Sequence, residues 1–255
     1  MAEQLTASLS DGLLLGFVYG LAAMGLTLIW GVMKVINLAH GATMALGMFV
    51  VFILFSRLNL HPYLALLLVV LLGLLFGYAV YAVSVHRVIN APYLSTLLAT
   101  FAVNMIIIGA GTAVFTTTPR TVDFDMGRVQ LGPVTLLGTR LVAALISLVA
   151  TAGLYVFLYR TRPGKSIRAV ANNRAAASLM GVPTSSTLAL AFGIGTMLAA
   201  LAGGLLIGQT VEHPRFGIGV IVATEGRGAD ARVQVNFGGS GMKWLALEYA
   251  RLTPV

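Results

Sequence analysis

Cysteine is absent from this chain of 255 residues, and charged side chains make up only 9% of it. Without cysteine the chain has no disulfide bond, no thiolate nucleophile and no Cys-ligated metal. An average soluble domain has about 25% charged residues, so the charged groups here are too few to cover a globular surface. This shortage excludes a soluble enzyme and a disordered chain, and it leaves the lipid bilayer as the surrounding solvent.

Apolar residues make up 58% of the chain, and the mean hydropathy is +0.93. A membrane-spanning helix needs about 20 mostly apolar residues. Six runs are of about this length and contain no Asp or Glu: Gly12–Met33, Val35–Phe55, Pro62–Val85, Leu94–Val114, Leu141–Tyr159 and Leu188–Ile207. In the second run, polar residues and the glycines Gly41 and Gly47 indicate a broken or partly re-entrant helix. We therefore predict a mostly α-helical, polytopic membrane bundle.

The charges between these runs predict the orientation of the bundle. If the N-terminus lies outside, the inner connections carry seven basic residues and no acidic one: Lys34, Arg87, Arg160, Arg162, Lys165, Arg168 and Arg174. The outer connections carry four basic residues, together with two acidic ones: Arg57, Arg120, Arg128, Arg140, Asp123 and Asp125. Because basic loops stay in the cytoplasm, we predict about six spans with the N-terminus outside. No Lys or Arg precedes Lys34, so the first run is interpreted as a span and not as a cleaved signal peptide.

Pairs of small residues four positions apart predict close helix packing. They are Gly16–Gly20, Gly73–Gly77, Ala199–Gly203 and Ala200–Gly204. Small residues let helix backbones approach each other in lipid, where apolar side chains alone give little drive to associate. These pairs carry no information about a substrate.

Three residues between the first two runs are candidates for a functional site: Asn37, His40 and Gly41. Polar side chains at a membrane helix end are costly unless they face a partner or a cavity. The alternative is that Asn37 and His40 only satisfy backbone groups that are freed where the helix breaks.

The tetrapeptide at 163–166, Pro-Gly-Lys-Ser, matches the end of a phosphate-binding loop. That loop needs a glycine where Tyr159 stands and a strand before it, so the match is false. Because the sequence has no other ATP-binding or metal-ligand pattern, we expect no cofactor and no enzymatic activity. Transport driven by ATP would need another subunit to hydrolyse it.

The stretch from Ser166 to Leu179 is predicted to be a short cytoplasmic helix. Ser166 is a possible N-cap, and Gly181 and Pro183 end the helix. Two interpretations stay open. The arginines of this helix meet acidic lipid headgroups, or the helix docks onto a cytosolic partner.

The composition changes near Gln209. The last 45 residues contain four acidic and five basic residues, and valines alternate with other residues around 220 and 233. A turn is predicted at 226–230, and Met242–Tyr249 forms a third apolar run. We predict a small, twisted antiparallel sheet, a β-barrel-like C-terminal module of a different kind from the bundle.

Residues 1–210 resemble the inner-membrane permease subunits of branched-chain amino-acid ABC transporters. The resemblance rests on the segments 35–41, 162–173, 176–182 and 191–204. It implies a bacterial inner-membrane, multi-pass protein that works with cytosolic ATPase subunits, a second permease subunit and a periplasmic solute-binding protein. It places Asn37, His40 and Gly41 near the translocation region. It also implies a segment that docks onto the ATPase, which includes Gly164, Lys165, Arg168, Ala169, Arg174, Ala176 and Gly181.

Residues 211–255 resemble the C-terminal Tudor-like module of UvrD/PcrA-type DNA helicases, so the chain looks like a fusion. The resemblance rests on the segments 211–219, 225–226, 232–237, 241–245 and 249–252. It implies a module that binds RNA polymerase or another protein and has no catalysis and no direct nucleic-acid binding. Its candidate interaction residues are Phe216, Gly217, Lys243 and Trp244. With six spans this tail emerges outside, whereas the helicase module belongs in the cytosol.

Three functions follow from these observations. The first is a permease subunit of an ATP-driven importer for branched-chain or related amino acids. It is truncated where such permeases continue with further spans, and loss of transport is one outcome of that truncation. The second is a membrane anchor for an interaction module. The third is a secondary transporter, which the absence of acidic residues in the candidate spans disfavours.

Overall fold

A computed structural model describes residues 2–115, 122, 127–131, 134–206, 210–213, 217–225, 232–236, 242–246 and 253–254. The chain forms two compact units. Unit 1 contains Met1–Thr116 and Met126–Leu206, and unit 2 contains Thr117–Asp125 and Ile207–Val255.

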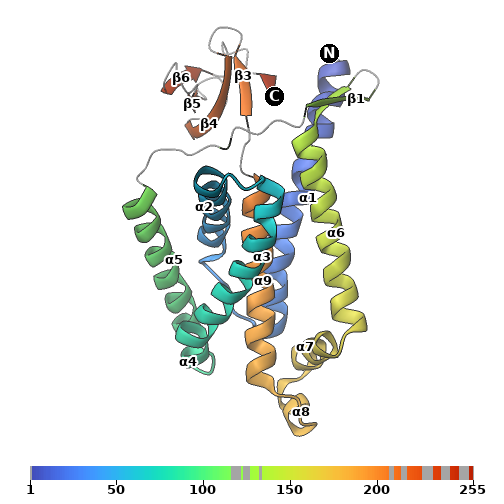
Figure 1. Ribbon diagram of the computed structural model, residues 1–255. Coiled ribbons are helices and arrows are strands. Elements are labelled where there is room, and N and C mark those ends of the chain that lie inside the picture. The colour runs from blue at the N-terminus through green and yellow to red at the C-terminus, as the bar shows by residue number, and fades with distance from the viewer. Residues whose placement is uncertain are drawn as a thin grey trace. The chain divides into compact units, whose positions relative to one another are not determined.

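Unit 1 is a helical bundle (Figure 1). Its helices are α1 (Ala2–Met33), α2 (His40–Leu58), α3 (Pro62–Val80), the π-helical turn η1 (Tyr81–Val85), α4 (His86–Val88), α5 (Tyr93–Phe115), α6 (Gly138–Arg160), α7 (Arg162–Asn172), α8 (Arg174–Leu179) and α9 (Thr184–Leu206). Two short strands, β1 (Arg128–Leu131) and β2 (Val134–Leu137), pair antiparallel before α6. In the described part of the chain, six helical stretches are long and apolar enough to cross a membrane. The predicted six-span, mostly helical bundle is confirmed.

Helix α9 forms the core of unit 1. It packs against α1, α2 and α3, and 83% of its apolar stretch is buried inside the protein. Among the largest fully buried side chains are Leu188, Phe192 and Leu198 of this helix. The other five candidate spans are 11–28% buried, so much of their apolar surface is left for lipid or for further protein.

Small residues let the neighbours of α9 come close. A Cβ atom added to Gly25 of α1 would lie 2.5 Å from the carbonyl oxygen of Gly195. A Cβ atom on Gly47 of α2 would overlap the backbone of Ala200, and one on Gly203 would overlap the backbone of Met44. These glycines therefore set the separation between α9 and the helices α1 and α2.

The predicted small-residue pairs differ in what they face. Gly73 and Gly77 of α3 lie directly against α9, as the packing prediction required. The pair Gly16–Gly20 of α1 has no atom of the described structure within 4 Å of an added Cβ. A side chain added at either glycine would therefore meet no neighbouring helix in the described part of the bundle.

The predicted break in the second span lies earlier than expected. Helix α2 is continuous over 19 residues and includes both Gly41 and Gly47, so the predicted run is interrupted before these glycines and not at them. The non-helical segment is 34–39, which the sequence prediction had largely placed inside the span. Lys34 has φ +57° and ends α1 in a left-handed conformation.

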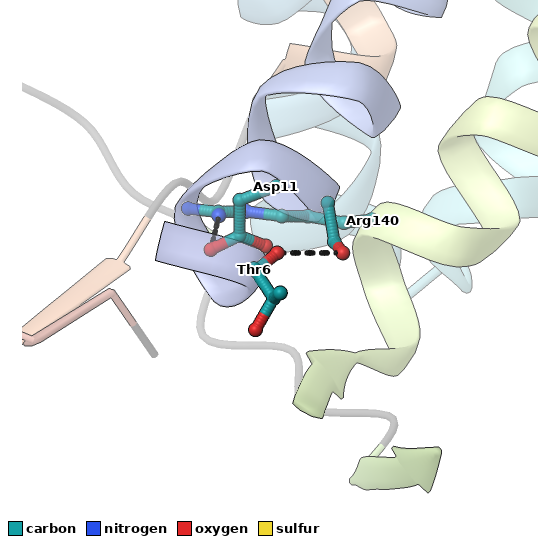
Figure 2. A network of polar contacts seen from close by, with 4 residues as sticks. Thr6, Asp11 and Arg140 are labelled. Carbon is teal, nitrogen blue, oxygen red and sulfur yellow. Dashed lines mark hydrogen bonds and ion pairs between the residues drawn. The ribbon is translucent and has the colours of Figure 1, made fainter. Parts of the chain in front are cut away.

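The two ends of the bundle differ in charge. The end of α1, the connection around α4 and the α7–α8 segment lie at the same end of the bundle, where the predicted inner basic residues gather (Figure 1). At the opposite end Asp11 of α1 and Arg140 of α6 form an ion pair, with 2.8 Å between Oδ2 and Nη1 (Figure 2). Directly before Asp11, the Ser10 hydroxyl donates to the carbonyl oxygen of Thr6 at 2.8 Å.

Unit 2 contains strands β3 (Thr210–His213), β4 (Gly217–Glu225), β5 (Arg232–Asn236), β6 (Met242–Ala246) and β7 (Thr253–Pro254). Their order in the sheet is β6-β5-β4-β3-β7, and all neighbours are antiparallel. A register shift between Ile221 and Ala223 interrupts the β4–β5 pairing. The third apolar run, predicted to reach Tyr249, is assigned as strand only to Ala246, and the predicted turn at 226–230 lies outside the described residues. Closure of the sheet into a barrel stays a prediction.

Candidate translocation and docking sites

The segment at 34–39 between α1 and α2 is held by side-chain hydrogen bonds. The Oδ1 atom of Asn37 accepts the backbone N–H of Ala39 at 3.1 Å, and Asn37 is buried. Asn37 therefore satisfies a backbone donor that is freed where the chain leaves the helix. This is the alternative to a role in a functional site.

Thr100 of α5 holds the same segment from outside. Its hydroxyl lies 3.1 Å from the carbonyl oxygen of Ile36 and accepts the backbone N–H of Leu38 at 3.3 Å. The side chain is fully buried. Sequence reasoning missed Thr100 because a single threonine in an apolar span has no distinguishing pattern.

His40 stands where α1, α2 and α9 meet. Its Nε2 atom lies 2.9 Å from the carbonyl oxygen of Ala22 in α1. A carbonyl oxygen only accepts, so Nε2 carries the proton and Nδ1 presents a lone pair. Nδ1 is buried and has no hydrogen-bond partner among the described residues. Gly41, the third predicted residue, is exposed at the first turn of α2.

A cavity of about 510 Å³ opens one turn beyond His40, between α2 and α3, and reaches α9 at Ala200. Gly47 and Gly73 lie on its walls. Its lining is almost wholly apolar, and the hydroxyl of Thr43 is occupied because it donates to the carbonyl oxygen of Ala39 at 2.8 Å. The cavity can therefore accept an aliphatic group but offers few hydrogen bonds.

The segment between α6 and α9 begins with a helix cap that sequence reasoning misplaced. The hydroxyl oxygen of Thr161 accepts the backbone N–H of Gly164 at 3.1 Å and caps α7. Ser166, the predicted cap, lies inside α7 and donates to the carbonyl oxygen of Arg162 at 3.2 Å. The cap lies earlier because Pro163 favours the first turn of a helix.

Gly164 and Arg168 attach α7 to the end of α6. A Cβ atom on Gly164 would overlap the backbone of Phe157. The Nε atom of Arg168 donates to the carbonyl oxygen of Leu158 at 3.1 Å, and its guanidinium lies 4.4 Å from the ring centre of Tyr159. This cation–π contact and hydrogen bond fix the angle between the two helices.

Asn173 divides the predicted single helix into α7 and α8. It has an extended backbone, and its Oδ1 atom accepts the backbone N–H of Ala176 at 3.0 Å to cap α8. Gly181, with φ +80°, follows the end of α8, and Pro183 comes before α9, as predicted. The inner faces are buried through Val170 and Ala177, which belong to a cluster that contains Phe192 of α9.

The outer face of the α7–α8 segment is exposed. Predicted docking residues on it are Lys165, Ala169, Arg174 and Ala176. Beside them Leu179 and Met180 are 87% and 84% exposed, and sequence reasoning did not select either residue. We define the docking surface as Lys165, Arg174, Ala176, Leu179 and Met180. Two apolar side chains directly before a helix-ending glycine are a signal that could have identified them.

Three of the four predicted residues of the tail lie in two strands. Gly217 begins β4, and Lys243 and Trp244 are in β6, where they pair with Val235 and Gln234 of β5. Phe216 lies outside the described residues.

Comparison with known proteins identifies the family of the bundle. The family described as the permease component of branched-chain amino acid transport systems matches residues 8–225. The chain belongs to this permease family. The match includes all six candidate spans and the docking surface, so the permease is a multi-pass membrane protein and its bundle is that of a transporter.

Three relatives illustrate the similarity of the permease to known proteins. The high-affinity branched-chain amino acid transport system permease protein LivH of Salmonella typhimurium is 28% identical over 215 residues, which are 78% of this chain and 69% of LivH. BraD of Pseudomonas aeruginosa, with the same description, is 27% identical over 214 residues, again 78% and 69%. A probable LivH of Methanocaldococcus jannaschii is 28% identical over 193 residues, which are 73% of this permease and 61% of that protein.

The tail of the permease matches a different family. The PcrA/UvrD tudor domain matches residues 207–254. DNA helicase II of Salmonella typhimurium is 48% identical over 62 residues, which are 24% of this chain and 9% of the helicase. The chain therefore joins a permease bundle to a helicase-type tudor segment, as a fusion does.

Proposed function

We propose that this chain is a membrane-spanning subunit of an importer for branched-chain or related amino acids, driven by ATP that separate cytosolic subunits hydrolyse. A second permease subunit and a periplasmic solute-binding protein complete the transporter. The observation that carries the proposal is the docking surface, which protrudes from the basic end of the bundle beside the central helix. The relatives' descriptions as branched-chain amino acid permeases support the substrate class.

The docking surface has the composition of an interface. Leu179 and Met180 expose most of their area at the end where basic residues gather, and the exposed Arg174 begins the same helix α8. Exposed apolar side chains rimmed by polar groups mark protein contacts. Because this end is cytosolic under the positive-inside rule, a soluble ATPase subunit is the partner that we propose.

Packing links the docking surface to the core. Val170 of α7 and Ala177 of α8 belong to the same buried cluster as Phe192 of α9. A displacement of the α7–α8 segment therefore reaches α9 through direct packing contacts. Since α9 also contacts α1, α2 and α3, the displacement reaches the helices around His40 and the cavity.

The cavity supports the proposed substrate class. Its apolar lining between α2 and α3 suits a branched aliphatic side chain better than a charged or strongly polar solute. We propose that Asn37, His40 and Gly41 border the path of the solute, with Asn37 and His40 acting through the hydrogen bonds that hold the segment at 34–39.

Substitution of Met180→Asp tests the docking proposal. We expect the amount of ATPase subunit that co-purifies with the chain to fall about tenfold, because an aspartate buried in the interface loses its hydration and gains no partner. Leu58→Asp is the matched control, because Leu58 is 66% exposed at the opposite end of the bundle. Equal co-purification for Met180→Asp and the unchanged chain would contradict the proposal. Charge reversal at Arg168 is a poorer test, because Arg168 holds α7 against α6.

A second proposal concerns the tail, and the tudor-domain match at 207–254 favours it. In this alternative the bundle anchors a module that binds RNA polymerase or another protein. Its test is the side of the membrane reached by a reporter fused after Val255 in the full chain. A periplasmic reporter would remove access to any cytosolic partner, and a cytosolic reporter would support the alternative.

A further inference from the structure

The basic side chains where α6 ends and α7 begins receive no countercharge from their own part of the chain. No acidic residue occurs from position 126 to position 211, a range that includes α6 to α9. At the opposite end of the bundle, by contrast, Arg140 is paired with Asp11. Three exposed arginine side chains at this corner form no ion pair with any residue that the structure describes: Arg160, Arg162 and Arg168. An anion from outside the chain is needed to compensate them.

Arg168 is held at this corner with most of its hydrogen-bonding capacity unused. Its Nε atom donates to the carbonyl oxygen of Leu158 at 3.1 Å, and its guanidinium lies 4.4 Å from the ring centre of Tyr159. The two Nη groups donate to no atom of the described structure. A guanidinium has five N–H donors in a plane, so four of them stay available in a fork that matches the oxygens of a phosphate group.

Two tyrosines of α6 place this corner at the surface of the bilayer. Tyr155 and Tyr159 are 62% and 48% exposed, and their ring centres lie 4.6 Å apart. At about 1.5 Å per residue, the 23 residues of α6 extend about 34 Å, so Tyr159 next to its last residue lies at the edge of a hydrocarbon core about 30 Å thick. Tyrosine is enriched at this depth in membrane proteins. The rings continue the exposed side of α6, whose apolar members are Leu145, Leu148, Val149 and Val156.

The position of the corner favours a lipid over the ATPase subunit. In Figure 1, α7 lies beside the end of α6, and α8 lies farther from the spans. The exposed apolar side chains of the docking surface, Leu179 and Met180, belong to the end of α8. The guanidinium of Arg168 instead rests on a ring of the side that α6 exposes to lipid. Lipid phosphate groups lie at this depth, next to the edge of the hydrocarbon core.

We propose that the α6–α7 corner, which consists of Tyr155, Tyr159, Arg160, Arg162 and Arg168, binds the phosphate group of an anionic membrane lipid. The Nη groups of Arg168 donate to the phosphate oxygens, and Arg160 and Arg162 add positive charge. The tyrosine rings pack beside the first carbons of the acyl chains. A zwitterionic lipid binds less tightly because it brings its own cation to the three arginines. This inference concerns the lipid around the permease and does not depend on ATP-driven transport.

Native mass spectrometry of the full chain in detergent, titrated with phosphatidylglycerol or phosphatidylcholine, measures both lipid affinities. We expect tighter binding of phosphatidylglycerol. The double variant Arg160→Gln, Arg162→Gln should lower that affinity about twentyfold, because each basic residue near anionic lipid contributes a factor of about five. It should leave the affinity for phosphatidylcholine unchanged. Arg57→Gln is the matched control, because Arg57 is exposed at the opposite end of the bundle, and it should change either affinity less than about twofold.

The role of the fixed guanidinium is tested separately. Arg168→Gln should lower the phosphatidylglycerol affinity at least as much as the double variant, and Arg168→Lys should restore only part of it, because an ammonium group does not bind phosphate in a bidentate manner. If Arg168→Gln fails to fold, the double variant still decides, since the side chains of Arg160 and Arg162 make no hydrogen bond within the described structure.

Four results would overturn the proposal. They are equal affinity for the two lipids, unchanged phosphatidylglycerol binding in the double variant, displacement of the lipid by millimolar inorganic phosphate, and loss of ATPase co-purification in the double variant with lipid binding intact. The third result would indicate a site for a free anion. The fourth would assign the arginines to the ATPase contact.

Discussion

Hydroxyl and amide groups of single residues, and not charges, shape the segment between α1 and α2. Asn37 satisfies one backbone donor from within the segment. Thr100 of α5 contacts the backbone of the two residues on either side of Asn37. Buried polar groups of this kind contribute most through the penalty of leaving their partners unsatisfied. The geometry at His40 therefore depends on a residue sixty positions away in the sequence.

Substitution of Thr100→Val is expected to lower the stability of the bundle by about 1–3 kcal/mol. Valine keeps the shape of threonine, but it leaves the Leu38 N–H and the Ile36 carbonyl without this contact. Thr112→Val is the control, because the Thr112 hydroxyl donates only within α5, to the carbonyl oxygen of Ile108 at 2.9 Å. Thermal unfolding in detergent measures both variants, and an equal effect would contradict a special role for Thr100.

At the scale of helices, α1 and α6 are joined by an ion pair. Asp11 and Arg140 lie 2.8 Å apart, with their side chains about one-fifth exposed (Figure 2). Charged side chains near a membrane are stabilised when they pair with each other. The pair therefore contributes to the relative position of the two helices.

A double-mutant cycle measures this coupling. Asp11→Asn, Arg140→Gln and the double variant are expected to show a coupling energy of about 1 kcal/mol at low salt, decreasing as salt is added. Chemical or thermal unfolding in detergent gives the three free energies. Additive effects of the two substitutions would show that the pair does not join the helices.

How far the helices were predictable depends on what sets their ends. Spans follow from apolar length, so all six were found. The end of α8 was also predicted, because the chain turns there with a φ of +80° that favours glycine, and Gly181 marks the position in the sequence. The start of α2 was missed because Val35, Ile36 and Leu38 are as apolar as the span that follows them, so apolar length extended the predicted run back to Val35. Asn173 was missed as a helix break because an asparagine in an alanine-rich run also fits a helix.

The candidate site was predictable in part. A sequence pattern located the segment around His40, and the structure gives it a buried, unpaired Nδ1 within the described residues. The sequence could not locate Thr100, Leu179 or Met180, because their roles depend on tertiary placement and exposure. It also assigned Arg168 to a partner, whereas its guanidinium lies over Tyr159 of α6.

At the scale of the whole molecule, charge asymmetry predicts orientation. Lys165 and Arg57 are exposed at opposite ends of the bundle. With the N-terminus outside, a membrane-impermeant maleimide added to spheroplasts should label Arg57→Cys, and it should label Lys165→Cys only after permeabilisation. The cysteine-free chain supplies the unlabelled control. The reverse labelling pattern would place the docking surface outside the cell and contradict its assignment to the cytosol.

The central position of α9 also has a consequence for biogenesis. Among the described spans, the one that forms the core is the last to leave the ribosome. Until then the glycine-containing faces of α1, α2 and α3 that pack on α9 lack their partner helix. A ribosome that stalls before residue 184 would therefore leave five inserted helices without their common partner, a form suited to recognition by membrane quality-control proteases.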